Sequence, residues 1–267
     1  MSRIATCFEK LKTQNRTALI PYVTAGDSKP SVTVPLMHAM VEAGADLLEL
    51  GVPFSDPMAD GPVIQAASER ALEHHVSLTD VINMVADFRQ QNKDTPVILM
   101  GYLNPIEVMG YEKFSGLAAA AGVDGVLTVD IPPEESSELI SAFKANSLDP
   151  IYLIAPTSTE ERIKSICANA TGFVYYVSVK GVTGAANLQV QAVEDKVNEI
   201  RRFTDLPIGV GFGISDAERA AEVGAVADAV VVGSALVKRV ASNAGDTDKI
   251  IQSVTELLRS MRTAMGN

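Results

Sequence analysis

The sequence predicts a single (β/α)8 barrel with an extra helix before the first strand, on two observations. Eight short and almost continuously apolar runs recur along the 267 residues, and such runs are typical of parallel strands buried on both faces. Segments with helical spacing of apolar residues separate them, so strands and helices alternate. The predicted strands are Ala18–Thr24, Asp46–Leu50, Val97–Tyr102, Gly125–Val129, Ile151–Ala155, Phe173–Val177, Ile208–Gly211 and Ala229–Val232.

Apolar spacing and end signals predict the helices between these strands. One apolar stripe has Pro35 near its start and Gly44 as its stop, and comprises Leu36, Ala39, Met40 and Ala43. A second lies near the C-terminus and comprises Ile250, Val254, Leu257, Leu258 and Met261. Thr159 and Ser215-Asp216 indicate capped helix starts. Residues 2–12 are also predicted to be helical, and this extra helix is expected to cap the barrel floor.

Eight such units in a chain of this length favour a closed TIM barrel, with residues 1–267 as one domain. A doubly wound open sheet is the alternative. A hydrophobic content of 47% is enough for one large core, and no linker or shift in composition indicates a second domain.

Charge and composition exclude several classes of protein. The formal net charge is −11 and no run of lysine or arginine occurs, which argues against nucleic-acid binding. No apolar stretch is long enough for a membrane span, and the first residues lack an apolar signal region, so a cytoplasmic protein is expected. Cys7 and Cys167 are expected to be reduced thiols. His74 and His75 are interpreted as solvated helix residues, and no metal site is expected.

Two carboxylates follow the second predicted strand, and barrel enzymes place their chemistry at this end. Glu49 lies among leucines, which raises the pKa of a carboxyl group and suits it to acid–base catalysis. The alternative is a buried Glu paired to a basic residue. Asp60 ends a long loop and precedes Gly61-Pro62, where a helix begins. It is either a second catalytic carboxylate or the N-cap of that helix.

Glycine turns after the seventh and eighth strands indicate a phosphate site. The first turn is Gly209 to Ser215 and the second is Gly233-Ser234-Ala235, each leading into a helix. Backbone N–H groups at such turns can bind phosphate, so that an acidic protein can hold an anion without a cluster of basic side chains. The alternative is that the glycines only allow tight turns. The glycine-rich segment 178–187 is either a mobile lid or an ordinary surface loop.

Several segments together resemble the tryptophan synthase alpha chain family over nearly the whole length. The most specific segment is the long one after the second strand, Leu50 to Pro62. The others are Pro21 to Asp27, Met100 to Pro105, Asp130 to Glu135, Gly181 to Gly184 and Gly211 to Gly213. Tyr22 stands where the family often has Phe, and Met58 and Met100 stand where it often has Leu. These departures leave the exact shape of the pocket open.

The resemblance implies a lyase that splits indole-3-glycerol phosphate into indole and glyceraldehyde 3-phosphate in tryptophan biosynthesis. Glu49 and Asp60 would be the catalytic pair, and Thr183 would meet Asp60 when the lid closes. The implied residues that bind substrate are Tyr22, Met100, Leu127, Leu153, Tyr175, Thr183, Gly184, Phe212, Gly213, Gly233 and Ser234.

The resemblance also implies a partner, the tryptophan synthase beta chain, in an alpha2-beta2 tetramer. Pyridoxal phosphate belongs to the beta chain, and no cofactor is expected here. Asp56, Pro57 and Asn104 would face the partner. The alternatives are another phosphate-binding barrel enzyme, such as a phosphosugar epimerase or an indole-glycerol phosphate synthase, and a non-catalytic regulatory subunit.

Overall fold

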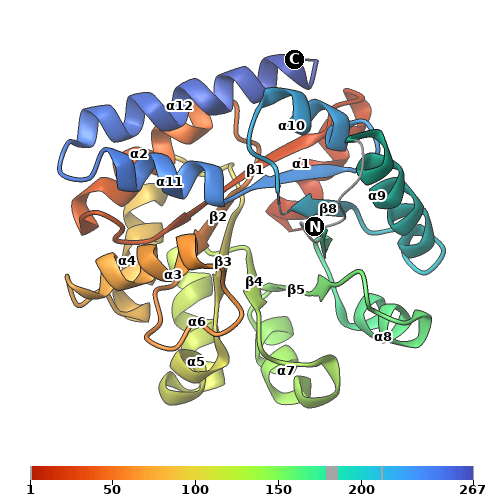
Figure 1. Cartoon of the computed structure of the whole chain (residues 1–267). Helices are drawn as coiled ribbons and strands as arrows, with labels where there is room; N and C mark the ends of the chain where they lie inside the picture. Colours follow the sequence, from red (N-terminus) through yellow and green to blue (C-terminus); the bar gives the residue numbers. More distant parts are fainter. Residues whose placement is uncertain (1, 179–185, 212, 267) are drawn as a thin grey trace.

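The computed structural model describes residues 2–178, 186–211 and 213–266, and in these residues nine parallel strand segments form one sheet (Figure 1). Their order is β5-β4-β3-β2-β1-β9-β8-β7-β6. The bounds are β1 Ala18–Thr24, β2 Leu48–Gly51, β3 Val97–Gly101, β4 Gly125–Thr128, β5 Asp149–Ile151, β6 Leu153–Ile154, β7 Val174–Val177, β8 Ile208–Gly211 and β9 Ala229–Val232.

The sheet closes on itself through its fifth strand. The first and last members of the order, β5 and β6, are separated in the chain by Tyr152 alone. β5 pairs with β4, and β6 pairs with β7. The predicted strand Ile151–Ala155 is therefore divided in two and begins earlier, at Asp149, because each half follows a different neighbour around the barrel. The doubly wound open sheet is excluded.

Helices surround the barrel and connect its strands (Figure 1). The first half contains α1 Arg3–Thr13, α2 Pro30–Glu42, α3 Pro62–Leu72, α4 Leu78–Arg89, α5 Leu103–Met109 and α6 Tyr111–Ala121. The second half contains the short 3-10 helix η1 Pro133–Glu135, then α7 Ser137–Ala145, α8 Glu160–Asn169, α9 Ala186–Arg201, α10 Ala217–Gly224, α11 Ser234–Ser242 and α12 Thr247–Ala264. In the described residues, no helix combines the length and the hydropathy that a membrane crossing requires.

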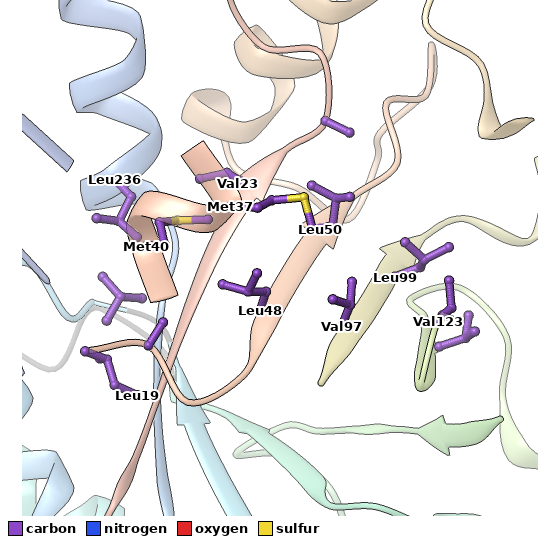
Figure 2. Packing of buried hydrophobic residues seen from close by; sticks show 14 of the residues in the cluster. Leu19, Val23, Met37, Met40, Leu48, Leu50, Val97, Leu99, Val123 and Leu236 are labelled. Carbon is purple, nitrogen blue, oxygen red and sulfur yellow. The ribbon is translucent and has the colours of Figure 1, made fainter. Parts of the chain in front are cut away.

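Alternation along the strands separates two apolar layers. Leu48 and Leu50 of β2 point outward and pack with Met37 and Met40 of α2 in the layer between strands and helices (Figure 2). Leu47 belongs to a second cluster, which fills the barrel interior. Since successive side chains of a strand point to opposite faces, Glu49 also points inward.

The extra helix α1 closes the floor of the barrel, as predicted. Ile4, Phe8 and Leu11 of this helix belong to the interior cluster. The Phe8 ring lies 5.8 Å from the ring of Phe173, which comes from the chain just before β7. The floor is thus filled by apolar side chains, which leaves the opposite end of the barrel for chemistry.

Most helix signals are confirmed, and two interpretations are wrong. The predicted C-terminal stripe is buried in α12, and Thr159 and Asp216 cap α8 and α10. Pro35 lies inside α2 rather than near its start, because the helix already begins at Pro30. His74 and His75 are exposed but follow α3 in a turn, where His75 has a φ of 56°.

Candidate active site

Glu49 lies inside the barrel near the carboxyl ends of the strands. It is the second residue of β2 and pairs in register with Tyr22 of β1 and Ile98 of β3. Only 2% of its surface is exposed. Its Oε1 has no hydrogen-bond partner among the described residues. Among the described residues, no basic side chain holds Glu49, in contrast to the predicted alternative of a Glu paired to a basic residue.

The surroundings of Glu49 disfavour its charged form. Burial raises the pKa of this carboxyl group to about 8, and the nearby charge of Asp60 adds to the shift. The sequence prediction of a raised pKa is thus confirmed in direction. A carboxyl group of this kind holds a proton near neutral pH and can release it to a substrate.

Asp60 is placed by a loop that folds back on itself after β2. The Asp60 N–H donates to Pro57 O at 3.0 Å, and the Gln65 amide donates to Asp60 O at 2.8 Å. The Asp60 carboxylate accepts a hydrogen bond of 3.0 Å from the Tyr102 hydroxyl. Asp60 is not the N-cap of α3, because Gly61 occupies that position. Its carboxylate is therefore free to act in the site.

An apolar wall adjoins the two carboxylates. Tyr22 is buried in one cluster with Ala67 of α3 and Val237 of α11, and Ile64 and Met100 pack against this cluster. Leu127, Leu153 and Tyr175 belong to or pack against the interior cluster from the far side of the barrel. Met100, Leu153 and Tyr175 are only partly buried. The predicted apolar positions among the described residues thus line one end of the barrel interior.

Two glycines make room for the tyrosine rings of this wall. A Cβ on Gly51 of β2 would lie 2.2 Å from the Tyr22 hydroxyl oxygen. A Cβ on Gly211 of β8 would lie 2.2 Å from the Tyr175 hydroxyl oxygen. Any larger residue at either position would therefore displace a ring that lines the interior.

Of the predicted phosphate positions, Gly213, Gly233 and Ser234 are described, and they follow β8 and β9. Gly213 has a φ of 81°, and Gly233 is the N-cap of α11 without a side-chain cap. Ser234, the first residue of α11, is exposed. The N-terminus of α10 differs, because Asp216 caps it through its own carboxylate. Of the two helix starts considered, that of α11 is the one without a side-chain cap.

Three predicted site residues, Thr183, Gly184 and Phe212, lie outside the described residues. The same holds for most of the candidate lid, since the described chain stops at Ser178 and resumes with α9. In the described residues, no group of three or more His, Cys, Asp or Glu side chains is arranged to hold a metal ion.

The residues predicted to face a partner lie on the surface beside the site. Asp56 and Asn104 are exposed, and Pro57 is partly so. Two large apolar side chains are also exposed: Met58, at 79%, and Val108 of α5, at 81%. Exposed apolar side chains of this size are typical of protein contacts.

Sequence reasoning missed two features of the site. Tyr102 stood in a segment of the resemblance without a role, although it bonds directly to Asp60. Ile64 of α3 packs beside Tyr22 and Met100. The apolar spacing of Val63, Ile64 and Ala67, directly after the Asp60 loop, was the available signal for α3 covering the site.

Comparisons with known proteins agree with this geometry. The model of the family described as tryptophan synthase alpha chain matches residues 8–266. The tryptophan synthase alpha chain of Thioalkalivibrio sulfidiphilus is 66% identical over 265 residues, which is 99% of this chain and 100% of that protein. That of Nitrosococcus oceani is 60% identical over 265 residues, 99% of this chain and 98% of that protein.

Solved structures show the same similarity. Tryptophan synthase subunit alpha from Legionella pneumophila superposes with a TM-score of 0.92 at 45% identity, over 99% of this chain and 98% of that one. A chain of tryptophan synthase from M. tuberculosis in its aminoacrylate-bound form gives a TM-score of 0.88 at 33% identity, over 99% of this chain and 100% of that one. With its barrel, its carboxylate pair and relatives matched end to end, the chain belongs to the tryptophan synthase alpha chain family.

Proposed function

We propose that this chain cleaves indole-3-glycerol phosphate with Glu49 as the acid–base group and Asp60 as the group that stabilises the indole nitrogen. Tryptophan synthase alpha chains are lyases that release indole from this substrate in tryptophan biosynthesis. The observation that carries the assignment is the pair of carboxylates inside the barrel, of which Glu49 is buried without a partner among the described residues.

The cleavage begins with a proton. Indole is a poor leaving group until its C3 carbon is protonated. Without that proton, breaking the bond to the glycerol carbon would leave a carbanion at C3. Glu49 supplies this proton, since its raised pKa of about 8 keeps it protonated near neutral pH. Protonation of C3 moves positive charge onto the ring nitrogen.

Asp60 then meets the charge that develops. Its carboxylate accepts a hydrogen bond from the indole N–H and stabilises the cationic ring. The glycerol carbon that is bonded to indole C3 carries a hydroxyl group, and this group loses its proton. The bond between that carbon and C3 then breaks, and glyceraldehyde 3-phosphate leaves as the aldehyde. Glu49, ionised by the first step, accepts that proton. The number of protons on the enzyme is therefore unchanged at the end of the reaction.

The rest of the site orients the substrate. The wall around Tyr22, Ile64 and Met100 is apolar and suits the indole ring. The glycine turn at Gly213 and the uncapped start of α11 at Gly233 and Ser234 offer backbone N–H groups to the phosphate. Together these features support a binding mode in which the reacting C–C bond of the substrate lies beside Glu49.

The partner of this reaction is a beta subunit, with which tryptophan synthase alpha chains work. We propose an alpha2-beta2 tetramer, in which the beta chain carries pyridoxal phosphate and consumes the indole. Asp56, Pro57, Met58 and Asn104 would face it, because Pro57 is partly exposed and the other three are exposed beside the site. We place both chains in the cytoplasm, where thiols such as the unpaired Cys7 and Cys167 stay reduced.

The direct test is release of indole from indole-3-glycerol phosphate, measured with and without a beta chain. Wild type should release indole, and Asp60→Asn should lower kcat by about a hundredfold to a thousandfold because the neutral amide stabilises the cationic ring poorly. Glu112→Gln is the control, because Glu112 is exposed on α6. It should match wild type.

The regulatory-subunit alternative predicts a different result. A wild-type chain that releases no indole under any condition, yet activates the beta chain, would contradict the proposal. Full activity of Asp60→Asn would remove Asp60 from the mechanism and leave the lyase reaction itself in place.

A further inference from the structure

Tyr102 joins the end of β3 to the loop that carries Asp60. It is the N-cap residue of α5 and only 3% of its surface is exposed. Its hydroxyl donates to Asp60 Oδ2 at 3.0 Å and accepts from the Ala59 N–H at 3.0 Å. Its ring lies 5.2 Å from the ring of Phe54, tilted by 30°. The side chain is therefore fixed at both its ring and its hydroxyl group.

The two hydrogen bonds decide which way the hydroxyl proton points. A phenol has one proton to donate, and its oxygen accepts. Because the Ala59 N–H occupies a lone pair of the oxygen, the proton is left for Asp60. A donor in this orientation favours the ionised form of a carboxyl group, since a protonated carboxyl gains less from it.

Burial acts on Asp60 in the opposite direction and has the larger effect, so the pKa of its carboxyl group is raised overall. The hydrogen bond from Tyr102 lowers this pKa. Glu49 on β2 and Tyr22 on β1 also face Asp60, and their negative forms are disfavoured by its charge. The neighbour from α3 is the neutral Gln65, which bonds to the Asp60 backbone.

The geometry points to Tyr102 as a positioning residue that orients Asp60 and holds it ionised, so that the second carboxylate oxygen can accept the indole N–H. Asp60 Oδ1 has no hydrogen-bond partner among the described residues, while Oδ2 is held by Tyr102. This inference rests on the proposed role of Asp60. It goes beyond that role by naming the group that keeps Asp60 in its working state.

The test compares the pH dependence of kcat/KM in wild type, Tyr102→Phe and Tyr152→Phe. Tyr102→Phe keeps the ring against Phe54 and removes only the hydroxyl. Tyr152→Phe is the matched control, because Tyr152 is also buried and its hydroxyl bonds to Ser136 Oγ at 2.7 Å, away from both carboxylates. All three proteins are assayed with a saturating beta chain, and thermal unfolding confirms that each is folded.

We expect the acid limb of the profile to move to higher pH in Tyr102→Phe, because Asp60 becomes harder to ionise. A shift of about one pH unit lowers kcat/KM about tenfold below the limb, and the rate recovers toward that of wild type above it. Tyr152→Phe should keep the wild-type profile. An unshifted limb in Tyr102→Phe, or a loss of equal size at every pH, would overturn the inference.

Asp60→Asn separates the two levels of the account. If Asp60→Asn is active, the proposed role of Asp60 fails and the role of Tyr102 fails with it. If Asp60→Asn is inactive and Tyr102→Phe has the wild-type profile, the role of Asp60 stands and Tyr102 alone is removed.

Discussion

At the scale of single residues, Glu49 is costly to the fold. A carboxyl group in an apolar interior needs either a partner or a proton, and the described residues give its Oε1 no partner. Burial therefore raises the pKa of the Glu49 carboxyl group to about 8, and the group is protonated at neutral pH. Such a cost is expected at a functional site, where stability and chemistry make opposite demands.

This cost predicts a pH-dependent gain in stability for Glu49→Gln. The pKa of Glu49 is higher in the folded chain than in the unfolded chain. Below the pKa of the unfolded chain, the group is protonated in both states and has its most favourable effect on stability. Its contribution is lost as pH rises from that value toward 8. Glutamine does not titrate, so the advantage of Glu49→Gln in free energy of unfolding should grow over this range, to on the order of 4 kcal/mol at pH 8.

Urea unfolding at pH 5 and at pH 8 measures this difference. Glu112→Gln on the surface of α6 should change the free energy of unfolding by less than about 0.5 kcal/mol at either pH. An advantage of Glu49→Gln that is the same at both pH values would contradict the raised pKa of Glu49.

At the scale of elements, strand ends and the helices after them assemble the site. β1 and β2 place Tyr22 beside Glu49 through their register, and the loop after β2 returns Asp60 to the same place. α3 then begins at Pro62 and covers the apolar wall with Ile64. Gly51, the last residue of β2, leaves the space that the Tyr22 ring occupies.

Gly51→Ala should therefore damage the proposed indole site without unfolding the barrel. The new Cβ would lie 2.2 Å from the Tyr22 hydroxyl oxygen, so the ring must move. Loss of one apolar wall contact of this kind is expected to raise KM for indole-3-glycerol phosphate about tenfold. Steady-state kinetics with a saturating beta chain measures the effect.

Gly116→Ala is the control for this substitution. Gly116 lies in α6, and the nearest atom to its ideal Cβ, apart from the backbone of the helix itself, is 3.9 Å away. Alanine is favoured over glycine inside a helix, so this variant should keep the wild-type KM. A wild-type KM in Gly51→Ala would show that Tyr22 does not line the bound substrate.

At the scale of the whole molecule, the two ends of the barrel divide the work. α1 fills the floor with Ile4 and Phe8, while Arg262 of α12 joins the outer layer to the start of β2 by an ion pair with Asp46. Both ion-pair partners are largely buried. Loss of either one would destabilise the fold, because the other charge would stay buried without a partner. The floor of the barrel is thus closed by apolar packing, and the opposite end is left for chemistry.

The sequence alone predicts much of this architecture. Strand β1 has the predicted bounds, because its residues are apolar on both faces and its ends are clear. The division of the fifth strand at Tyr152 was not predictable, since pairing to two different neighbours leaves no signal in local composition. The position of Pro35 within its helix was also predicted wrongly. Proline is favoured in the first turn of a helix, but α2 begins at Pro30 and contains Pro35 in its interior.

The candidate site was predicted less evenly. Glu49 was found because leucines beside a carboxylate indicate burial, and its neighbours in sequence are also its neighbours in the strand. Tyr102 was not assigned, because its bond to Asp60 joins residues 42 positions apart across a loop. Pairwise contacts at this distance depend on the path of the loop, which a single sequence does not specify.

The central claim is that Glu49 transfers the proton that releases indole. The most direct measurement is a single turnover of bound indole-3-glycerol phosphate by wild type and Glu49→Gln, each saturated with a beta chain. We predict that indole formation slows about a thousandfold in the variant, which still stimulates the beta reaction. Cleavage at the wild-type rate by Glu49→Gln would contradict the claim.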